Sequence, residues 1–226
     1  LPMINRDTLR RLTEIENARF LATHPKSGEL FKKGQANMPG GVPMSWMAKW
    51  PGAYPIFVKE AKGARFTDVD GNTYIDFCLG DTGSMTGHSP DATVAAIREQ
   101  VGKGITAMLP TADAAIVSAE LSRRFGLPFW QFTVSATDAN RHVIRYSRMI
   151  TGRSKIIVID RCYHGSVDET FATLDGAGNT VSREGNIGAP VVLDQTTRVV
   201  EFNDIAGMEK ALSHGDVAAI LMEPAM

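Results

Sequence analysis

The sequence is poor in cysteine, has no excess of positive charge and contains no long apolar run. Its two cysteines, Cys78 and Cys162, lie far apart and match no disulfide or metal-ligand spacing, so we expect free thiols and a cytoplasmic protein. The 24 lysines and arginines balance 25 acidic residues, which argues against a nucleic-acid partner. No run of about 18 apolar residues occurs, and charges interrupt Leu1 to Arg11, so we expect neither a membrane span nor a signal peptide.

A dinucleotide-binding fingerprint is also absent. Gly176 and Gly178 begin a glycine-rich pattern, but Val181 occupies the position of the third glycine, so we reject a dinucleotide site. No metal-binding motif is found, and no metal is expected. The 226 residues, of which 43% are hydrophobic, are enough for one large or two small domains.

Residues 130–152 combine a short apolar run, a set of helix-starting residues and an amphipathic run. The pattern predicts a strand over Trp130–Val134, a tight turn at Ser135 to Asp138, and a helix ending near Gly152. Such a turn directs free backbone N–H groups and the positive end of a helix dipole at one point, which suits a phosphate. The same residues are also typical of an ordinary helix cap.

The N-terminal part is expected to mix helices with a small antiparallel sheet. An amphipathic helix over residues 7–20 would pack on its own core or on a partner subunit. Three strand-like runs follow within residues 55–77, beginning with Ile56 to Val58, and Asp70-Gly71 predicts a hairpin between the last two. Two further helices are expected, one starting at Ser89-Pro90-Asp91 and one over residues 112–125.

The C-terminal part alternates apolar strands with helices. Residues 155–160 and 217–222 predict strands buried on both faces, and residues 205–213 predict a helix between them, which indicates a parallel sheet covered by helices. Residues 173–190 are rich in Gly, Asn and Ser and predict a long loop or flap.

Polar side chains follow the carboxyl ends of these strands, where ligands of parallel sheets bind. They are the hydroxyls flanking Ala136 (Ser135 and Thr137), the pair Tyr163 and His164, and Glu223. A flat, phosphorylated, nitrogen-containing ring would suit this set: phosphate at the helix start, ring against Tyr163, carboxylate near its polar substituents. Tyr163 and His164 are equally typical of satisfied core residues.

Several short motifs occur in a characteristic order: Pro39-Gly40-Gly41-Val42, Ala61-Lys62-Gly63-Ala64, Asp68 to Phe77, Gly87-His88, Thr151-Gly152-Arg153, Cys162-Tyr163-His164-Gly165 and Glu223-Pro224. Together they resemble the class III, fold-type I aminotransferases that use pyridoxal 5′-phosphate, most of all the branch containing glutamate-1-semialdehyde aminomutase. The resemblance covers nearly the whole chain, and the shared order of the motifs makes it specific.

The resemblance implies an α/β fold of type I, a mostly parallel sheet flanked by helices with a small N-terminal α+β part. Residues 1–86 would be an arm and small-domain elements, including a hairpin at 64–77, and residues 87–226 the N-terminal portion of the large cofactor-binding domain. The expected cofactor-binding residues are Ser135, Ala136 and Thr137, in place of the family's Ser-Gly-Thr phosphate loop, with Tyr163 stacked on the ring, His164 and Glu223.

The expected substrate pocket departs from the branch at two positions. Met47 stands where the branch has an arginine that binds a substrate carboxylate, and Asp81 stands where it has a tryptophan; Trp46 is the third pocket residue. This change predicts preference for a neutral or amino-bearing substrate over a carboxylate. Alternatively, another arginine, such as Arg141 or Arg183, takes over the carboxylate.

The family's catalytic lysine and the aspartate that pairs with the pyridine nitrogen lie downstream of Glu223-Pro224. No catalytic residue is therefore expected in this chain; the lysine would lie beyond Met226, and the chain would be the N-terminal half of an enzyme. The implied activity moves an amino group from an amine or amino-acid donor to a keto or aldehyde acceptor by a ping-pong mechanism, in a homodimer with shared active sites. Two alternatives stay open: a 2,1-aminomutase of the glutamate-1-semialdehyde type, and a lysine-free fragment that binds the cofactor without chemistry.

Overall fold

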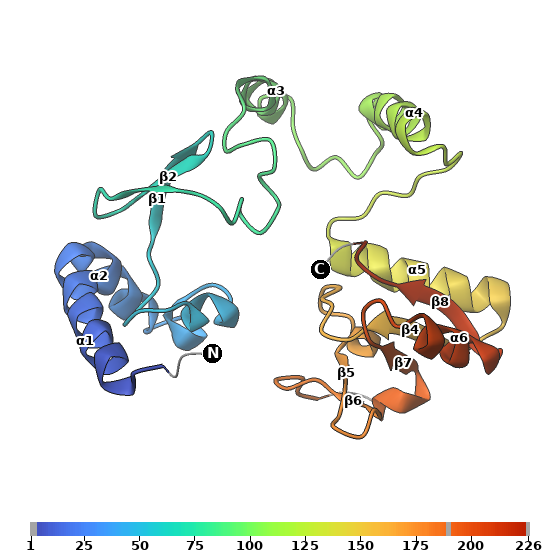
Figure 1. The fold of residues 1–226 in the computed structure, drawn as a ribbon. Helices are drawn as coiled ribbons and strands as arrows, with labels where there is room; N and C mark the ends of the chain where they lie inside the picture. Colours follow the sequence, from blue (N-terminus) through green and yellow to red (C-terminus); the bar gives the residue numbers. More distant parts are fainter. Residues whose placement is uncertain (1–3, 189–190, 225–226) are drawn as a thin grey trace. The chain divides into compact units, whose positions relative to one another are not determined.

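The computed structural model describes residues 4–188 and 191–224, and the chain forms two compact units, Leu1–Pro110 and Thr111–Met226 (Figure 1). The predicted division between residues 86 and 87 concerned the domains of a complete enzyme and stays a prediction. In the sequence, the boundary between the two units falls between Pro110 and Thr111. No helix in the described ranges is long and apolar enough to cross a membrane.

Two consecutive helices open the first unit. Helix α1 covers Arg6–Thr23 and begins where the side chain of Asn5 accepts hydrogen bonds from the backbone N–H groups of Asp7 and Thr8, which confirms the predicted N-terminal helix. Helix α2 covers Pro25–Gly34, with proline at its first position, where no N–H is needed. No residue pattern in the sequence predicted α2.

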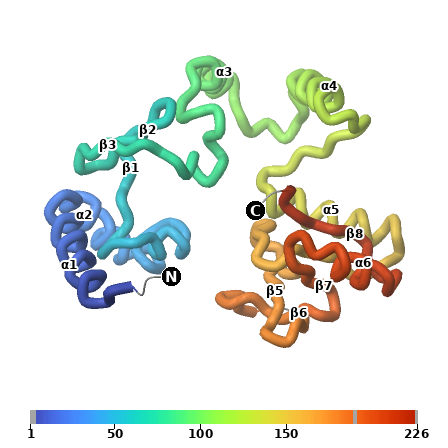
Figure 2. Tube along the Cα trace, viewed as in Figure 1, coloured from blue at the N-terminus to red at the C-terminus, as the bar shows by residue number. Residues whose placement is uncertain are grey.

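A three-stranded antiparallel sheet follows, in the order β1-β2-β3 (Figure 2). Its strands are β1 (Val58–Lys62), β2 (Arg65–Asp68) and β3 (Thr73–Ile75). The predicted hairpin at 64–77 is confirmed, because β2 and β3 pair from Arg65↔Ile75 to Thr67↔Thr73 around Asp70-Gly71, where Gly71 has a φ of 97°. The strand predicted at Ile56 to Val58 is displaced, since β1 begins only at Val58.

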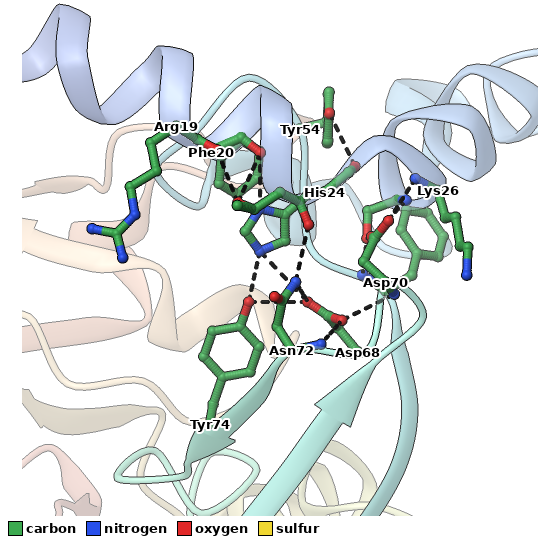
Figure 3. Close-up of polar contacts among 12 residues, drawn as sticks. Arg19, Phe20, His24, Lys26, Tyr54, Asp68, Asp70, Asn72 and Tyr74 are labelled. Carbon is green, nitrogen blue, oxygen red and sulfur yellow. Dashed lines mark hydrogen bonds and ion pairs between the residues drawn. The ribbon is translucent and has the colours of Figure 1, made fainter.

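A buried polar cluster connects α1 and α2 to this sheet (Figure 3). The carboxylate of Asp68 is fully buried and accepts hydrogen bonds from the Asn72 and Asp70 backbones and from the Tyr74 hydroxyl, while His24 Nε2 lies 2.6 Å from that hydroxyl. Burial raises the pKa of Asp68, but these hydrogen bonds outweigh burial and hold it below its ordinary value. Burial and the neighbouring Asp68 raise the pKa of Tyr74 to about 12.

The second unit has helices on both faces of a parallel sheet. Its strand order is β7-β4-β8, and β4 pairs in parallel with both neighbours. The elements at its centre are α5 (Ala136–Thr151), β4 (Lys155–Ile159), β7 (Thr197–Val200), α6 (Ile205–Ser213) and β8 (Val217–Leu221). The predicted helices and the two predicted strands are thereby confirmed; β7 was not anticipated.

Alternate side chains of β4 enter two separate cores. Ile156 and Val158 pack with Ile144 of α5 on one face, and Ile157 packs with Ala211 of α6 on the other. All of these β4 side chains are at most 1% exposed, as expected of a strand covered on both sides.

The remaining elements belong neither to the sheet β1-β2-β3 nor to the parallel sheet and its two covering helices. They are α3 (Asp91–Val101), α4 (Asp113–Phe125), the hairpin strands β5 (Ala172–Leu174) and β6 (Thr180–Ser182), and 3₁₀ turns at Pro39–Gly41, Ser45–Lys49, Asp168–Thr170 and Leu193–Gln195. The helices predicted after Ser89 and over residues 112–125 correspond to α3 and α4.

Two predictions for the second unit are wrong. Residues 130–134 form no strand in the described structure, and Val134 is 99% exposed, so its β-branched side chain has no sheet against which to pack. Residues 173–188 are not one loop, because β5 and β6 pair from Ala172↔Ser182 to Leu174↔Thr180 around a turn held by Asp175; residues 189 and 190 lie outside the described residues.

We predict that Asp68→Ala destabilises the protein by about 3 kcal/mol, because it leaves several buried donors without an acceptor. Urea unfolding of the natural protein, followed by circular dichroism, would measure the loss. Glu14→Gln, an exposed change on α1, is the control and should shift the midpoint little. Equal midpoints for the two variants would contradict a structural role for the cluster.

Candidate functional site

The N-terminus of α5 lies near the carboxyl edge of the parallel sheet, and its first backbone N–H groups have no hydrogen-bond partner among the described residues. Ser135 caps the helix, and its hydroxyl accepts a hydrogen bond from the backbone N–H of Asp138 at 3.2 Å. The first N–H groups of a helix have no acceptor within the helix, so those of Ala136 and Thr137 are directed out of its end together with the positive end of the dipole. This geometry favours an anion.

The loop after β4 packs directly on this helix start. The hydroxyl oxygen of Thr137 accepts a hydrogen bond from the backbone N–H of Ser166 at 3.0 Å, so its own proton remains available for an acceptor. Gly165 has a φ of 81°, and a Cβ at this position would lie 2.3 Å from Thr137 Oγ1. Only glycine therefore fits the loop this close to the helix.

His164 is buried behind the same loop and contributes an unsatisfied nitrogen. Its backbone carbonyl accepts a hydrogen bond from Asn140 of α5 at 2.9 Å. Its Nε2 is buried and has no hydrogen-bond partner among the described residues. Burial lowers the pKa of His164, although the charge of Glu223 and the backbone carbonyl of Leu221 act in the opposite direction. Burial therefore favours the neutral form of the imidazole.

The structure brings most of the predicted cofactor residues together. Thr137 contacts the loop that carries His164, and Glu223 after β8 lies near enough to act electrostatically on that histidine. Tyr163 is 59% exposed beside them. Its stacking role and the individual roles of the other residues stay predictions.

Three polar residues at the carboxyl edge of the parallel sheet were not predicted from the sequence: Asn140, Asp160 and Ser166. Asn140 holds the backbone of His164, and Asp160, at the end of β4, accepts hydrogen bonds from the Thr173 hydroxyl and the Leu174 N–H. Burial raises the pKa of Asp160, but these bonds prevail and keep it below its ordinary value. A carboxylate directly after a buried strand was the available signal for Asp160. Ser166 contributes its backbone N–H, which donates to Thr137, and a backbone contact of this kind cannot be predicted from a residue pattern.

The two arginines named as alternative carboxylate ligands are directed at backbone carbonyls. Arg141 donates to the carbonyl of Ser166 at 3.1 Å, and Arg183 donates to that of Cys162 at the same distance. Both therefore support the loop after β4.

The predicted substrate-pocket residues line one cavity in the first unit. Trp46, Met47 and Asp81 surround a space of about 700 Å³. Trp46 and Met47 lie in the 3₁₀ turn Ser45–Lys49, and the ring of Trp50 stands edge-on to that of Trp46 at 6.4 Å. The apolar side chains of Trp46, Met47 and Trp50 thus form walls of a pocket.

A carboxylate and a histidine fix the segment that carries Asp81. Asp76 accepts hydrogen bonds from the backbone N–H groups of Cys78 and Leu79, both at 2.9 Å, and contacts His88 Nε2 at 2.6 Å. The hydrogen bond from His88 holds the pKa of Asp76 below its usual range. Within the described ranges, no group of three or more His, Cys, Asp or Glu side chains could hold a metal ion.

The backbone N–H groups of Ala136 and Thr137 and the hydroxyls of Ser135 and Thr137 together form an anion cradle. A parallel sheet covered by helices, with such a cradle at its carboxyl edge, is typical of a domain that binds a phosphorylated ligand. The family model of the class III aminotransferases matches residues 46–226, and the chain belongs to this family. Its structural relatives include fold-type I enzymes that bind pyridoxal phosphate, and the predicted α/β fold class is confirmed.

Curated relatives carry a consistent name. A glutamate-1-semialdehyde 2,1-aminomutase of Methanocaldococcus jannaschii is 34% identical over 204 residues, which are 89% of this chain and 47% of that protein. The chain therefore spans about half the length of the curated relatives it matches, and it corresponds to their N-terminal half.

Solved structures similar to this chain include aminomutases and a transaminase. A glutamate-1-semialdehyde aminomutase from Pseudomonas aeruginosa PAO1 is 49% identical with a TM-score of 0.93, covering 98% of this chain and 49% of that one, and a lysine-to-alanine variant of it was solved in complex with PMP. An omega-transaminase from Sphaerobacter thermophilus is 29% identical with a TM-score of 0.77, covering 88% of this chain and 47% of that one.

We predict that Gly165→Ala is more destabilising than Gly178→Ala. Both glycines have nearly the same positive φ, 81° and 82°, but only at position 165 would the new Cβ meet the start of α5. A Cβ at Gly178 would meet no atom within 4 Å apart from those of its two chain neighbours. The difference in free energy of unfolding should be about 2 kcal/mol, since overpacking adds to the shared conformational cost. Equal losses in denaturant titrations would show that the loop can move away.

We also predict a pH effect from His164. Because its folded pKa is lowered, the unfolded state binds more protons as the pH falls below about 6.5, so this residue reduces stability there. In the cofactor-free protein, His164→Gln should flatten the fall in melting temperature between pH 7 and 5. His142→Gln, an exposed change on α5, is the control. Parallel curves for wild type and His164→Gln would contradict the assignment.

Proposed function

We propose that the complete protein is a pyridoxal-phosphate-dependent aminotransferase that transfers an amino group from an amine or amino-acid donor to a keto or aldehyde acceptor. The observation that carries this proposal is the anion cradle at the start of α5, on which the loop with Gly165 packs closely. Behind it lies His164, whose Nε2 has no hydrogen-bond partner in the part of the chain that the structure describes. Membership of the class III family and the pyridoxal-phosphate and PMP complexes of its relatives support it.

The residues present suit this cofactor. The N–H groups of Ala136 and Thr137, with the Ser135 and Thr137 hydroxyls, would hold the phosphate, and a phosphate at this point would gain from the helix dipole. Tyr163 offers an exposed aromatic face for a planar ring. His164 and Glu223 would face the polar edge of the ring, where neutral imidazole accepts a hydrogen bond and the carboxylate orients hydroxyl or cationic groups.

When bound, the cofactor supplies an electron sink that makes the proton next to a substrate amine acidic. The residues of this chain would bind and orient it: the cradle would hold the phosphate, and the loop after β4 would hold the ring. The lysine that moves the proton and the aspartate that pairs with the ring nitrogen are proposed to lie beyond Met226.

A 2,1-aminomutase acting within one molecule is the second candidate. The 49% identity to the Pseudomonas aeruginosa aminomutase favours it. The Met47 and Asp81 positions favour the intermolecular reaction instead, because the cavity they line offers a carboxylate where a carboxylate-bearing substrate needs a cation. We further propose a cytoplasmic homodimer with shared active sites, in line with the family resemblance.

The deciding experiment uses the purified natural protein. Pyridoxal phosphate should give a yellow chromophore that borohydride fixes to the chain, and a ¹⁵N-labelled amine should pass its label to a separate carbonyl acceptor. Label retained within one molecule would establish the aminomutase instead. Absence of a fixed chromophore would leave only a protein that binds the cofactor without chemistry.

We predict that Thr137→Val weakens pyridoxal-phosphate binding about tenfold to a hundredfold, because a charge-assisted hydrogen bond to phosphate is lost. Thr151→Val, at the opposite end of α5, is the matched control and should leave the affinity unchanged. Fluorescence or absorbance titration of the natural protein would measure both dissociation constants. Equal affinities would place the phosphate elsewhere.

A further inference from the structure

The aromatic ring of Tyr163 is not held in place by packing. Its side chain is 59% exposed, and no other aromatic ring among the described residues packs against it. The rotamers open to a side chain depend on the backbone that carries it. The direction of this ring therefore depends on how firmly the loop after β4 is held.

Part of this loop is held by side chains of α5. The carbonyl of His164 accepts a hydrogen bond from the Asn140 amide at 2.9 Å. The carbonyl of Ser166 accepts one from the Arg141 guanidinium at 3.1 Å. Both donors lie on α5, so the loop from residue 164 onward follows that helix.

The peptide group directly before Tyr163 is held from a different element. The guanidinium of Arg183 donates a hydrogen bond to the carbonyl of Cys162 at 3.1 Å. It makes no ion pair with a described carboxylate, so this carbonyl is the acceptor of its charge-assisted bond. The Cys162 carbonyl and the Tyr163 N–H belong to one planar peptide group. The bond from Arg183 thus fixes the plane from which Tyr163 starts.

Arg183 follows β6 directly, and the hairpin β5–β6 is anchored beside the same loop. Asp160, at the end of β4, accepts hydrogen bonds from the Thr173 hydroxyl at 2.6 Å and the Leu174 N–H at 3.0 Å. The N–H of Arg183 donates to the carbonyl of Phe171 at 2.8 Å, which joins the two ends of the hairpin. The chain leaves the sheet at Asp160, and the hairpin held by Asp160 returns a guanidinium to the carbonyl two residues later.

We propose that Arg183 is a positioning residue for the Tyr163 ring: through the Cys162 carbonyl it holds the ring in one orientation for stacking on a planar cofactor. The hairpin β5–β6 is then a brace of the cofactor site. That the planar ligand is pyridoxal phosphate rests on the proposed function; the hold on the Tyr163 backbone does not. This assignment replaces the alternative in which Arg183 binds a substrate carboxylate.

Hydrogen exchange of the natural protein, followed by mass spectrometry, tests the hold on the backbone. Arg183→Gln should speed exchange of the amides over residues 162–166 about tenfold, because a charge-assisted hydrogen bond is lost. Arg183→Lys keeps a cationic donor and should restore part of the protection. Arg145→Gln is the matched control, an exposed change on α5 at a residue without a hydrogen bond in the described ranges, and should leave exchange unchanged.

Two results of the exchange experiment would overturn the proposal. One is equal protection of residues 162–166 in the Arg183→Gln and Arg145→Gln variants. The other is faster exchange of β4 to the same extent as the loop, since that would be a general loss of stability and not the release of one loop.

A double-mutant cycle on pyridoxal-phosphate affinity tests whether the hold serves the ring. Arg183→Gln should weaken binding about fivefold and Tyr163→Ala about tenfold, and the double variant should be no weaker than Tyr163→Ala. Arg183→Gln should also reduce the visible circular dichroism of the bound cofactor. Inorganic phosphate probes the cradle alone and should bind with unchanged affinity. Additive losses, or an equal loss of phosphate affinity, would contradict a role through Tyr163.

The two experiments separate this inference from the proposed function. If the wild-type protein binds no pyridoxal phosphate while Arg183→Gln frees the loop, the proposed function fails and the positioning of Tyr163 stands. If the cofactor is bound and turned over but the losses are additive, the proposed function stands and the inference fails. If Arg183→Gln raises KM for carboxylate-bearing substrates alone and leaves the circular dichroism of the cofactor unchanged, Arg183 belongs to the substrate and the inference fails.

Discussion

The burial of β4 on both faces is the constraint on which the second unit depends. Ile156 and Val158 face one core and Ile157 the other, so the strand can neither slide nor rotate without exposing apolar side chains. Its parallel neighbours β7 and β8 fix its register. The chain therefore leaves the sheet at Asp160 in one defined place, and the loop with His164 and Gly165 starts from that point. The geometry of the candidate site follows from this strand.

The contact between Gly165 and Thr137 connects that loop to the start of α5. Alanine at position 136, where the family pattern has glycine, is compatible with this contact because Ala136 is already the first residue of the helix, and alanine is the best helix former. The glycine that the packing requires lies on the opposite side, at 165, where a Cβ would meet Thr137. The cradle thus tolerates a methyl group in the helix and excludes one from the loop.

The spacing of apolar residues predicted the elements whose side chains are buried in the cores of the second unit, and it failed where a strand depends on its pairing partner. The helices α5 and α6 and the strands β4 and β8 followed from apolar spacing, and Asp70-Gly71 located the β2–β3 hairpin. Residues 130–134 have strand-forming side chains, but a strand also needs a neighbour. The pair β5–β6 was missed because each strand has only three residues, too few for a clear alternation, and because the turn between them is held by Asp175. The cluster of His24, Asp68 and Tyr74 joins residues 50 positions apart, which no local pattern reveals.

The anion cradle and the cavity of the first unit are built from different kinds of chemical group. The anion cradle in the second unit consists mainly of backbone N–H groups and hydroxyls, which any phosphorylated cofactor can use and which the fold itself supplies. The cavity in the first unit consists of side chains, so its selectivity changes with single residues such as Met47 and Asp81. The backbone groups of the cradle come with the fold, whereas the proposed choice of substrate rests on a few side chains on the turns around residues 46 and 81. High overall identity therefore defines the cofactor chemistry more firmly than it defines the substrate.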